Sequence, residues 1–208
     1  MNPADDPAGG RVGAGAAAVR LGSPAELVAA VPTLLRYHPR DSVVIIGLLD
    51  GDYGHRVGPV LRGDLPTTPT QPHAGRATPQ AVAEAVGWTT SVIAAVPTHL
   101  RLSAAVVITL AERLPPLVWP LLRVGFEHLN LPIHAAVHAE STHPGAAWTC
   151  LCAAPDCCEG GVLAGGTSVL ETHAVLAGHV RYATREQWVD AGMPGTWDGV
   201  HPPGDLAP

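Results

Sequence analysis

The residues best suited to chemistry lie in a polar turn, His38-Pro39-Arg40-Asp41-Ser42, between a predicted helix and a predicted strand. His38 could serve as a general base, with Asp41 orienting its ring and Ser42 close by. No nucleophile elbow or oxyanion loop is recognisable elsewhere in the sequence, so a hydrolase triad is not expected. The alternative is structural, because the same side chains could cap the end of the helix or the start of the strand.

A second polar pair, Arg62 and Asp64, lies at the end of the next predicted strand. Two residues apart in an extended chain, their side chains point to the same face. A guanidinium matches the planar geometry of a carboxylate, sulfate or phosphate, and Asp64 would tune it. The alternative is a local ion pair that anchors the following loop. We therefore predict that the catalytic candidates are His38, Asp41 and Asp64. The substrate-binding candidates are Arg62, Arg40 and Ser42.

A β-hairpin is expected to bring the two polar groups together. Residues 43–49 form a continuous aliphatic run, which is typical of a strand buried on both faces. A turn at residues 50–54 leads into a return strand over residues 55–62. The start of the first strand then pairs with the end of the second, so Asp41 and Arg62 should be neighbours. Their side chains are predicted to form an ion pair or to surround a shared anion.

Caps and prolines indicate the other elements. Ser23, Pro24 and Glu26 have the pattern of a capping box, and Pro39 ends this first helix. The apolar periodicity predicts further strands over residues 104–110, 132–138 and 147–151, and further helices over residues 79–95, 116–129, 168–177 and 184–191. This order predicts an α/β fold, with a mixed sheet of about five strands and helices packed on it.

The predicted domain boundaries follow from the composition of the ends. We expect a single α/β domain over residues 21–192, a flexible Gly- and Ala-rich N-terminal arm over residues 1–20, and a Pro- and Gly-rich tail over residues 193–208. A Pro- and Thr-rich loop over residues 64–78 is long enough to be a lid or a simple connection.

Four cysteines are crowded together in the last third of the sequence, at Cys150, Cys152, Cys157 and Cys158. Their spacing lacks the two separated ligand pairs that zinc sites usually show, so we predict no bound metal. Other possibilities stay open: partly buried thiols that close a loop on the core, a local disulfide such as Cys152–Cys157, a catalytic thiolate, or a zinc site completed by His138 or His143.

The composition argues against several classes of protein. The chain has 208 residues, of which 47% are hydrophobic, and a net charge of −6. This supports a globular core and argues against nucleic acid as a partner. The sequence has neither a transmembrane apolar run nor a signal-peptide pattern, so we expect a cytoplasmic protein without a membrane partner. It also lacks a dinucleotide fingerprint and a phosphate loop, and no cofactor is expected.

Several motifs together resemble one known family, the actinobacterial domain of unknown function 4192 family. They span roughly residues 21 to 190 and comprise Leu21, Ser23 and Pro24, Val31-Pro32, His38-Pro39-x-Asp41-Ser42, Arg62-x-Asp64-Leu65-Pro66, Trp148, Cys152, Cys157-Cys158, Gly166-Thr167 and Arg185-Glu186. The resemblance implies a fold and an actinobacterial origin, and it carries no established activity.

Two functions are consistent with these observations. The first is an accessory or interaction protein that works with a partner chain or as a homo-oligomer, which fits the lack of a recognisable catalytic set. The second is an enzyme, or one subunit of a heteromeric enzyme, in secondary-metabolite biosynthesis. All twelve basic residues are arginine, which favours a small anionic substrate. An example is ring closure with expulsion of sulfate or phosphate.

Overall fold

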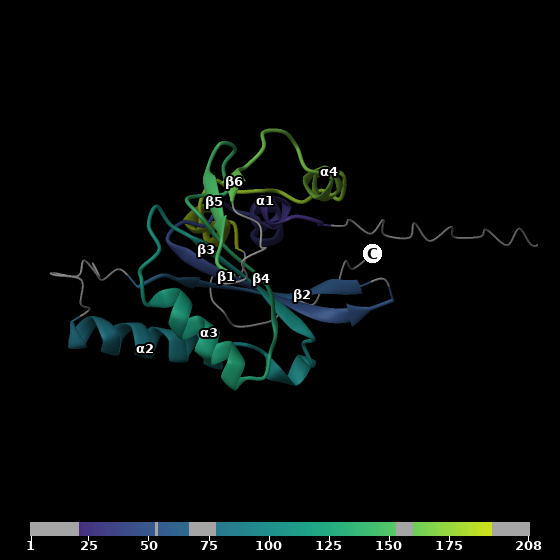
Figure 1. Ribbon diagram of the computed structural model, residues 1–208. Helices are drawn as coiled ribbons and strands as arrows, with labels where there is room; N and C mark the ends of the chain where they lie inside the picture. Colours follow the sequence, from purple (N-terminus) through teal and green to yellow (C-terminus); the bar gives the residue numbers. More distant parts are fainter. Residues whose placement is uncertain (1–20, 53, 67–77, 153–159, 193–208) are drawn as a thin grey trace, which may run out of the picture.

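The computed structural model describes residues 21–52, 54–66, 78–152 and 160–192. These residues form three layers, with a sheet in the middle and helices on both of its faces (Figure 1). The sheet has six strands in the order β2-β1-β3-β4-β5-β6. Helix α1 (Pro24–Leu35) and helix α4 (Val169–Leu176) cover one face, and α2 (Pro79–Ala94) and α3 (Val118–His128) cover the other. The predicted α/β class and single mixed sheet are confirmed, with six strands instead of about five.

Strands β1 (Ser42–Gly51) and β2 (Gly54–Asp64) form the predicted antiparallel hairpin. Ser42 pairs with Asp64, and Val44 pairs with Arg62. The residues of β1 are buried from its start to Leu48, because β2 and β3 flank it in the sheet and helices cover both faces. The hairpin register therefore places the polar turn before β1 beside the polar end of β2.

The remaining strands bring further loops to the same edge. Strand β3 (Ala104–Leu110) is antiparallel to β1, and β4 (Ile133–Ala139) is parallel to β3. Leu110 pairs with both Ser42 and Ala139, so the carboxyl ends of β3 and β4 meet the start of β1. Ligands of open α/β sheets bind outside the carboxyl ends of the strands. This edge is therefore the expected position of a site.

The sheet is completed by β5 (Ala147–Cys150) and the two-residue strand β6 (Gly161–Val162). A short 3₁₀ helix, η2 (Thr98–Leu100), precedes β3, and α5 (Arg185–Asp190) is the last described helix. The predicted arm, the predicted tail, most of the predicted lid and residues 153–159 of the cysteine segment lie outside the described residues. Among the described residues, none of the helices combines the length and apolar character needed to cross a membrane.

Helix α1 begins at its predicted cap but ends earlier than predicted, before the chain reaches Pro39. The Ser23 hydroxyl accepts a hydrogen bond from the Glu26 N–H at 3.2 Å, and the Glu26 carboxylate accepts one from the Ser23 N–H at 3.2 Å. This reciprocal pair is the predicted capping box. The helix ends at Arg36, which adopts a left-handed backbone with φ 65°. The chain then runs through Tyr37, which forms a parallel bridge with Tyr182.

Two apolar clusters hold the layers together, one on each face of the sheet. Alternate residues of β1 divide between them: Val44 and Ile46 pack towards α1, whereas Val43 and Ile45 pack towards α2 and α3. Helices α2 and α3 approach closely at Gly125, where a Cβ atom would lie 2.5 Å from Cγ1 of Ile93. The two faces of the sheet thus have separate apolar cores.

Candidate functional site

Arg62 is the centre of the polar group at the sheet edge. Its side chain is 13% exposed, and its Nε donates to the Ser42 hydroxyl at 2.9 Å. Its guanidinium forms an ion pair with Asp64, whose side chain is 72% exposed. The backbone carbonyl of Arg40 accepts hydrogen bonds from the Ser42 hydroxyl and, at 3.5 Å, from Arg62. Four of the six predicted site residues therefore converge here.

Asp41 lies beside this group, but the predicted ion pair between Asp41 and Arg62 is not formed. Arg62 pairs with Asp64. The Asp41 carbonyl accepts a hydrogen bond from the Leu65 N–H at 2.7 Å, which confirms that the polar ends of the hairpin are adjacent. Asp41 is exposed and has a left-handed backbone with φ 42°. Arg62 and Asp64 point to the same face because they are two residues apart in a strand, which explains why they pair.

Tyr37 is part of the same group, although the sequence analysis did not single it out. The residue is 4% exposed. Burial raises the pKa of its hydroxyl, while Arg62 and Arg185 act to lower it. The hydroxyl therefore stays protonated at neutral pH and lies within the electrostatic reach of two guanidinium groups. It is a neutral hydrogen-bond donor on which the charges of Arg62 and Arg185 act.

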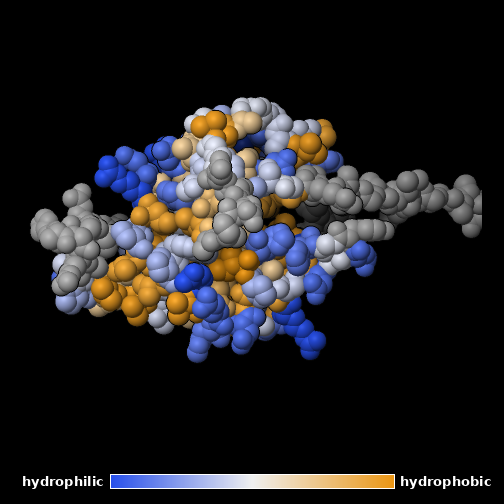
Figure 2. Space-filling view, viewed as in Figure 1, coloured by the Kyte–Doolittle hydropathy of each residue, from blue (hydrophilic) through white to orange (hydrophobic). Residues whose placement is uncertain are grey.

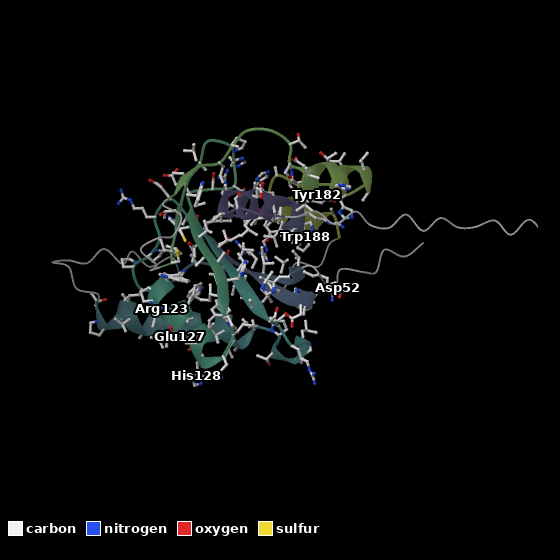
Figure 3. All side chains as sticks on the ribbon, turned by 45° about the vertical axis from the view of Figure 1, so that its right-hand side comes forward. Asp52, Arg123, Glu127, His128, Tyr182 and Trp188 are labelled. Atoms are coloured by element: carbon white, nitrogen blue, oxygen red, sulfur yellow. The ribbon has the colours of Figure 1, made fainter. Side chains whose placement is uncertain are left out.

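Trp188 completes the group from α5. Its ring lies against that of Tyr37, with 5.7 Å between centroids. Figure 3 shows Trp188 and Tyr182 on the α1 side of the sheet, opposite Arg123 and Glu127. The indole Nε1 of Trp188 is buried and has no hydrogen-bond partner in the described part of the chain. A buried N–H without an acceptor costs about 1–3 kcal/mol, so it is a place where a ligand acceptor would be stabilising.

We call this group the Arg62 site, defined by the residues Tyr37, Ser42, Arg62, Asp64, Arg185 and Trp188. The start of α5 is held next to Tyr37 by the contact between the Trp188 and Tyr37 rings. Arg62 contributes to lowering the pKa of the Glu186 carboxyl, after the larger effects of its own backbone N–H, the Thr184 hydroxyl and Arg185. The only sequence signal for α5 was its capping pattern and the Arg185-Glu186 pair. That signal predicted a helix and did not predict its position beside β2.

His38 belongs to a different polar group. Its Nδ1 is 2.8 Å from the hydroxyl of Thr142, and its ring stacks on His143 with 4.4 Å between centroids and 14° between planes. The predicted pairing of His38 with Asp41 is therefore not formed. The reason is the strand order: Thr142 follows β4 on one side of β1, whereas Asp41 lies beside β2 on the other. Thr142 is the residue that orients His38.

Burial lowers the pKa of three histidines. For His38, the nearby His143 and Arg181 lower the pKa further. For His138, the hydrogen bond with Thr109 acts to raise the pKa and so opposes the effect of burial. For His179, the neighbouring Arg36 lowers the pKa further. Each imidazole binds a proton less readily in the folded chain than in the unfolded chain. All three side chains are therefore suited to neutral hydrogen-bonding roles, and His38 could accept a proton as a base.

These shifts predict a loss of stability on acidification. Between the lowered pKa values and about 6.5, the unfolded chain binds more protons than the folded chain, so stability rises with pH and is lost as pH falls through this window. Thermal unfolding should show a decreasing Tm from pH 7.5 to pH 5.5. His38→Gln should flatten this slope, whereas His128→Gln, at an exposed position of α3, should not. An unchanged slope in His38→Gln would contradict the assignment.

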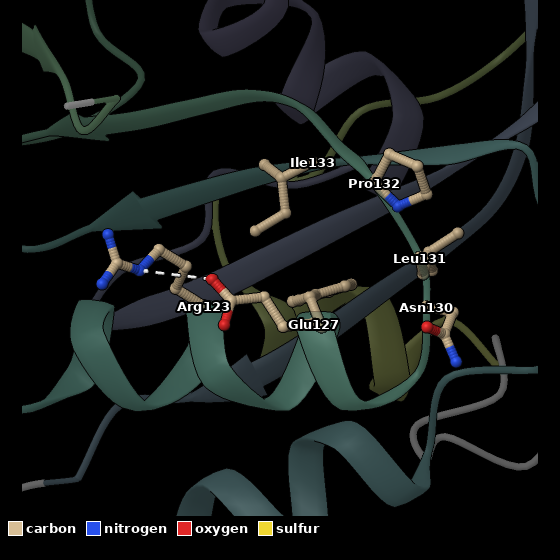
Figure 4. A pocket seen from close by; sticks show the side chains of 7 residues that line it. Arg123, Glu127, Asn130, Leu131, Pro132 and Ile133 are labelled. Carbon is tan, nitrogen blue, oxygen red and sulfur yellow. Dashed lines mark ion pairs between the residues drawn. The ribbon is translucent and has the colours of Figure 1, made fainter. Parts of the chain in front are cut away.

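One cavity lies away from these groups. It has a volume of about 390 Å³ and is located where α3 leads into β4 (Figure 4). Its polar lining includes Arg123 and Glu127, which form an exposed i,i+4 pair at 3.7 Å, and Asn130. None of the predicted site residues lines it. We therefore place the candidate site at the sheet edge.

The cysteine segment is only partly described. Cys150 Sγ lies 2.7 Å from Cys152 Sγ, and Cys152 is disulfide-bonded. Cys157 and Cys158, and with them the predicted Cys152–Cys157 pairing, lie outside the described residues. In the described ranges no group of three His, Cys, Asp or Glu residues could hold a metal ion. The absence of a metal from the whole loop stays a prediction.

A family model described as a domain of unknown function (DUF4192) matches residues 24–198. No curated protein and no solved structure matches the chain. The matched range includes every residue of the Arg62 site.

Proposed function

The chain belongs to the domain of unknown function 4192 family, and we propose that it binds a small oxyanion at the Arg62 site. The main support is the buried Trp188 Nε1, a hydrogen-bond donor that has no acceptor among the described residues. It lies on the ring that contacts Tyr37, whose hydroxyl is a second donor near Arg62 and Arg185. A neutral donor without an acceptor, together with the positive charge of the arginines that act on Tyr37, favours an acceptor-only ligand group, such as carboxylate, sulfate or phosphate.

Asp64 regulates access in this proposal. Its carboxylate holds the Arg62 guanidinium in the ligand-free chain, and its side chain is 72% exposed. Because the Asp64 side chain is mostly exposed, water can solvate its carboxylate when an incoming oxyanion displaces it. Displacement would also remove the negative charge closest to the ligand. The anion then meets a guanidinium that Ser42 already orients through its 2.9 Å hydrogen bond with Nε.

As an enzyme or a subunit of one, the chain would act on a small substrate that carries such a group. In a ring closure, a substrate amine forms a bond to carbon while the carbon–oxygen bond to sulfate or phosphate breaks. The bonding electron pair leaves with the oxyanion, which Arg62 would stabilise. The amine proton would pass to the displaced Asp64 carboxylate.

The direct test is an NMR titration of the full chain with sulfate, phosphate and acetate, followed through the Trp188 indole N–H. We expect a saturable downfield shift of this proton as it gains an acceptor, with chloride at equal ionic strength as the control. A Trp188→Phe chain identifies the signal. An indole signal that none of the three anions moves would contradict the proposed site.

A second candidate function, an interaction protein, is favoured by the surface of α2. This helix has sixteen residues, of which Glu84 alone is charged. Val82 and Val86 are 40% and 44% exposed, and Val124 of α3 is 56% exposed. Figure 2 shows apolar side chains gathered over α2, at the lower left of the view. Surface helices usually carry polar residues on the outer face, so this face fits a partner chain or a second copy.

If α2 forms an interface, light scattering of the purified chain should show a dimer or a larger species. Val86→Lys should shift the distribution towards the monomer, because a lysine in an apolar contact loses its hydration without gaining a partner. Val162→Lys is the matched control, since Val162 is 67% exposed on β6. If the wild-type chain is monomeric at all accessible concentrations, self-association through α2 is excluded. A different partner chain is then the remaining explanation of the apolar face.

A further inference from the structure

We infer that the groove between α1 and α4 is a second ligand site, which binds a short-chain aliphatic carboxylic acid in its ionised form. The groove has a volume of about 210 Å³ and is lined by residues of α1, α4 and the segment that follows α4. Its lining includes none of the residues of the Arg62 site. The proposal therefore does not depend on the function proposed above.

The first observation is an unpartnered imidazole. His179 lines the groove, and its Nε2 is buried without a hydrogen-bond partner among the described residues. The backbone N–H of His179 donates to the Ala174 carbonyl at 2.9 Å, which fixes the residue at the end of α4. Polar atoms buried in native proteins nearly always have a partner, so a partner from outside the chain is expected here.

The second observation is the charge of the groove. Arg181 forms an ion pair with Glu171 at 2.7 Å, and the two charges cancel. Arg36 lines the same groove and forms no ion pair with any described residue. Its backbone is held by a hydrogen bond from the Tyr182 N–H at 2.7 Å. One uncompensated guanidinium selects a ligand with a single negative charge, for which a carboxylate offers the matching bidentate geometry.

The third observation is the wall of the groove. Pro32 of α1 and Val175 and Val180 near α4 supply apolar surface, and the two valines are 65% and 59% exposed in the ligand-free chain. The volume is below the range of about 300–1,000 Å³ that is typical for drug-sized ligands. A ligand with a few apolar carbons and one carboxylate would cover these valines and give Arg36 and His179 their missing partners.

The test is calorimetric titration of the full-length Arg62→Met chain, in which oxyanion binding at the Arg62 site is weakened, with sodium 4-methylpentanoate. We expect one saturable site, and Arg36→Gln should weaken it at least about tenfold because a charge-assisted hydrogen bond is lost. His179→Phe should also remove binding without lowering the Tm of the ligand-free chain, since it deletes a buried polar atom that has no partner. His179→Gln provides a second variant if phenylalanine does not fit.

Two controls separate this site from others. Arg123→Gln in the same Arg62→Met background removes an exposed arginine from the opposite face of the sheet (Figure 3) and should leave 4-methylpentanoate binding unchanged. The uncharged 4-methylpentan-1-ol and inorganic phosphate should bind at least about tenfold more weakly. No saturable binding, equal binding of the alcohol, or unaltered affinity in both Arg36→Gln and a folded His179 variant would overturn the inference.

Discussion

Arg62→Met is expected to weaken oxyanion binding at the Arg62 site by about 100-fold or more while the chain stays folded. The substitution removes charge-assisted hydrogen bonds, each worth about 1.5–3 kcal/mol, and a loss of about 2.8 kcal/mol corresponds to a 100-fold change in Kd. Methionine keeps an unbranched apolar stem in the place of a side chain that is 13% exposed. Calorimetry and the Trp188 indole shift would measure the loss in the same samples.

The folded state should tolerate the change. The Ser42 hydroxyl still donates to the Arg40 carbonyl, so it keeps a partner when Arg62 is lost. Asp64 is 72% exposed and can be solvated by water. No buried charge is left uncompensated, and we expect the free energy of unfolding to fall by less than about 2 kcal/mol. This small cost is what distinguishes a ligand-binding arginine from one that only anchors the hairpin.

Two matched variants sharpen the test. Arg56→Met removes an exposed arginine of the same strand, whose one hydrogen bond within the described ranges goes to the Asp50 carbonyl at 3.4 Å, and should change neither binding nor stability. Asp64→Asn removes the carboxylate that competes for Arg62 and should strengthen oxyanion binding. If Arg62→Met lowers stability by several kcal/mol and leaves binding unchanged, the arginine is an anchor and the site lies elsewhere.

Local sequence signals account for most of the fold. The capping pattern of Ser23 and Glu26 and the aliphatic run of β1 each depend on neighbours in sequence, and both predictions are confirmed. Strand β6 was missed because a two-residue strand has no periodicity to detect. The sheet order depends on contacts between distant segments, so the sequence indicated a mixed sheet without specifying which strands are neighbours.

The hairpin register explains why half of the site was predictable. Ser42 and Asp64 are paired residues of one antiparallel ladder, so their approach, and that of Arg62, follows from local turn and strand signals. Tyr37 and Trp188 are distant in sequence, and their contact depends on how α5 docks beside the Tyr37–Tyr182 bridge. No local pattern contains that information. The pairing of His38 with Thr142 was missed for the same reason.

Phe126→Ala should have the largest effect on stability, with a decrease of about 3–5 kcal/mol in the free energy of unfolding. Phe126 of α3 is 0% exposed and is among the largest fully buried side chains. It belongs to the apolar cluster between the sheet and the α2 and α3 layer. Chemical denaturation would measure the change. Val124→Ala, at a 56% exposed position of the same helix, should stay within about 0.5 kcal/mol of the wild type.

The same variant tests whether the scaffold and the Arg62 site are separable. Phe126 packs on the face of the sheet opposite α1, whereas Ser42 and Arg62 share their face with Val44 and the α1 cluster. Strand residues that point to opposite faces do not share side-chain contacts. Below its lowered Tm, the folded Phe126→Ala chain should therefore bind oxyanions with the affinity of the wild type. A loss of affinity at a temperature where the variant is fully folded would show that the α3 layer helps to position the Arg62 site, although the two lie on opposite faces of the sheet.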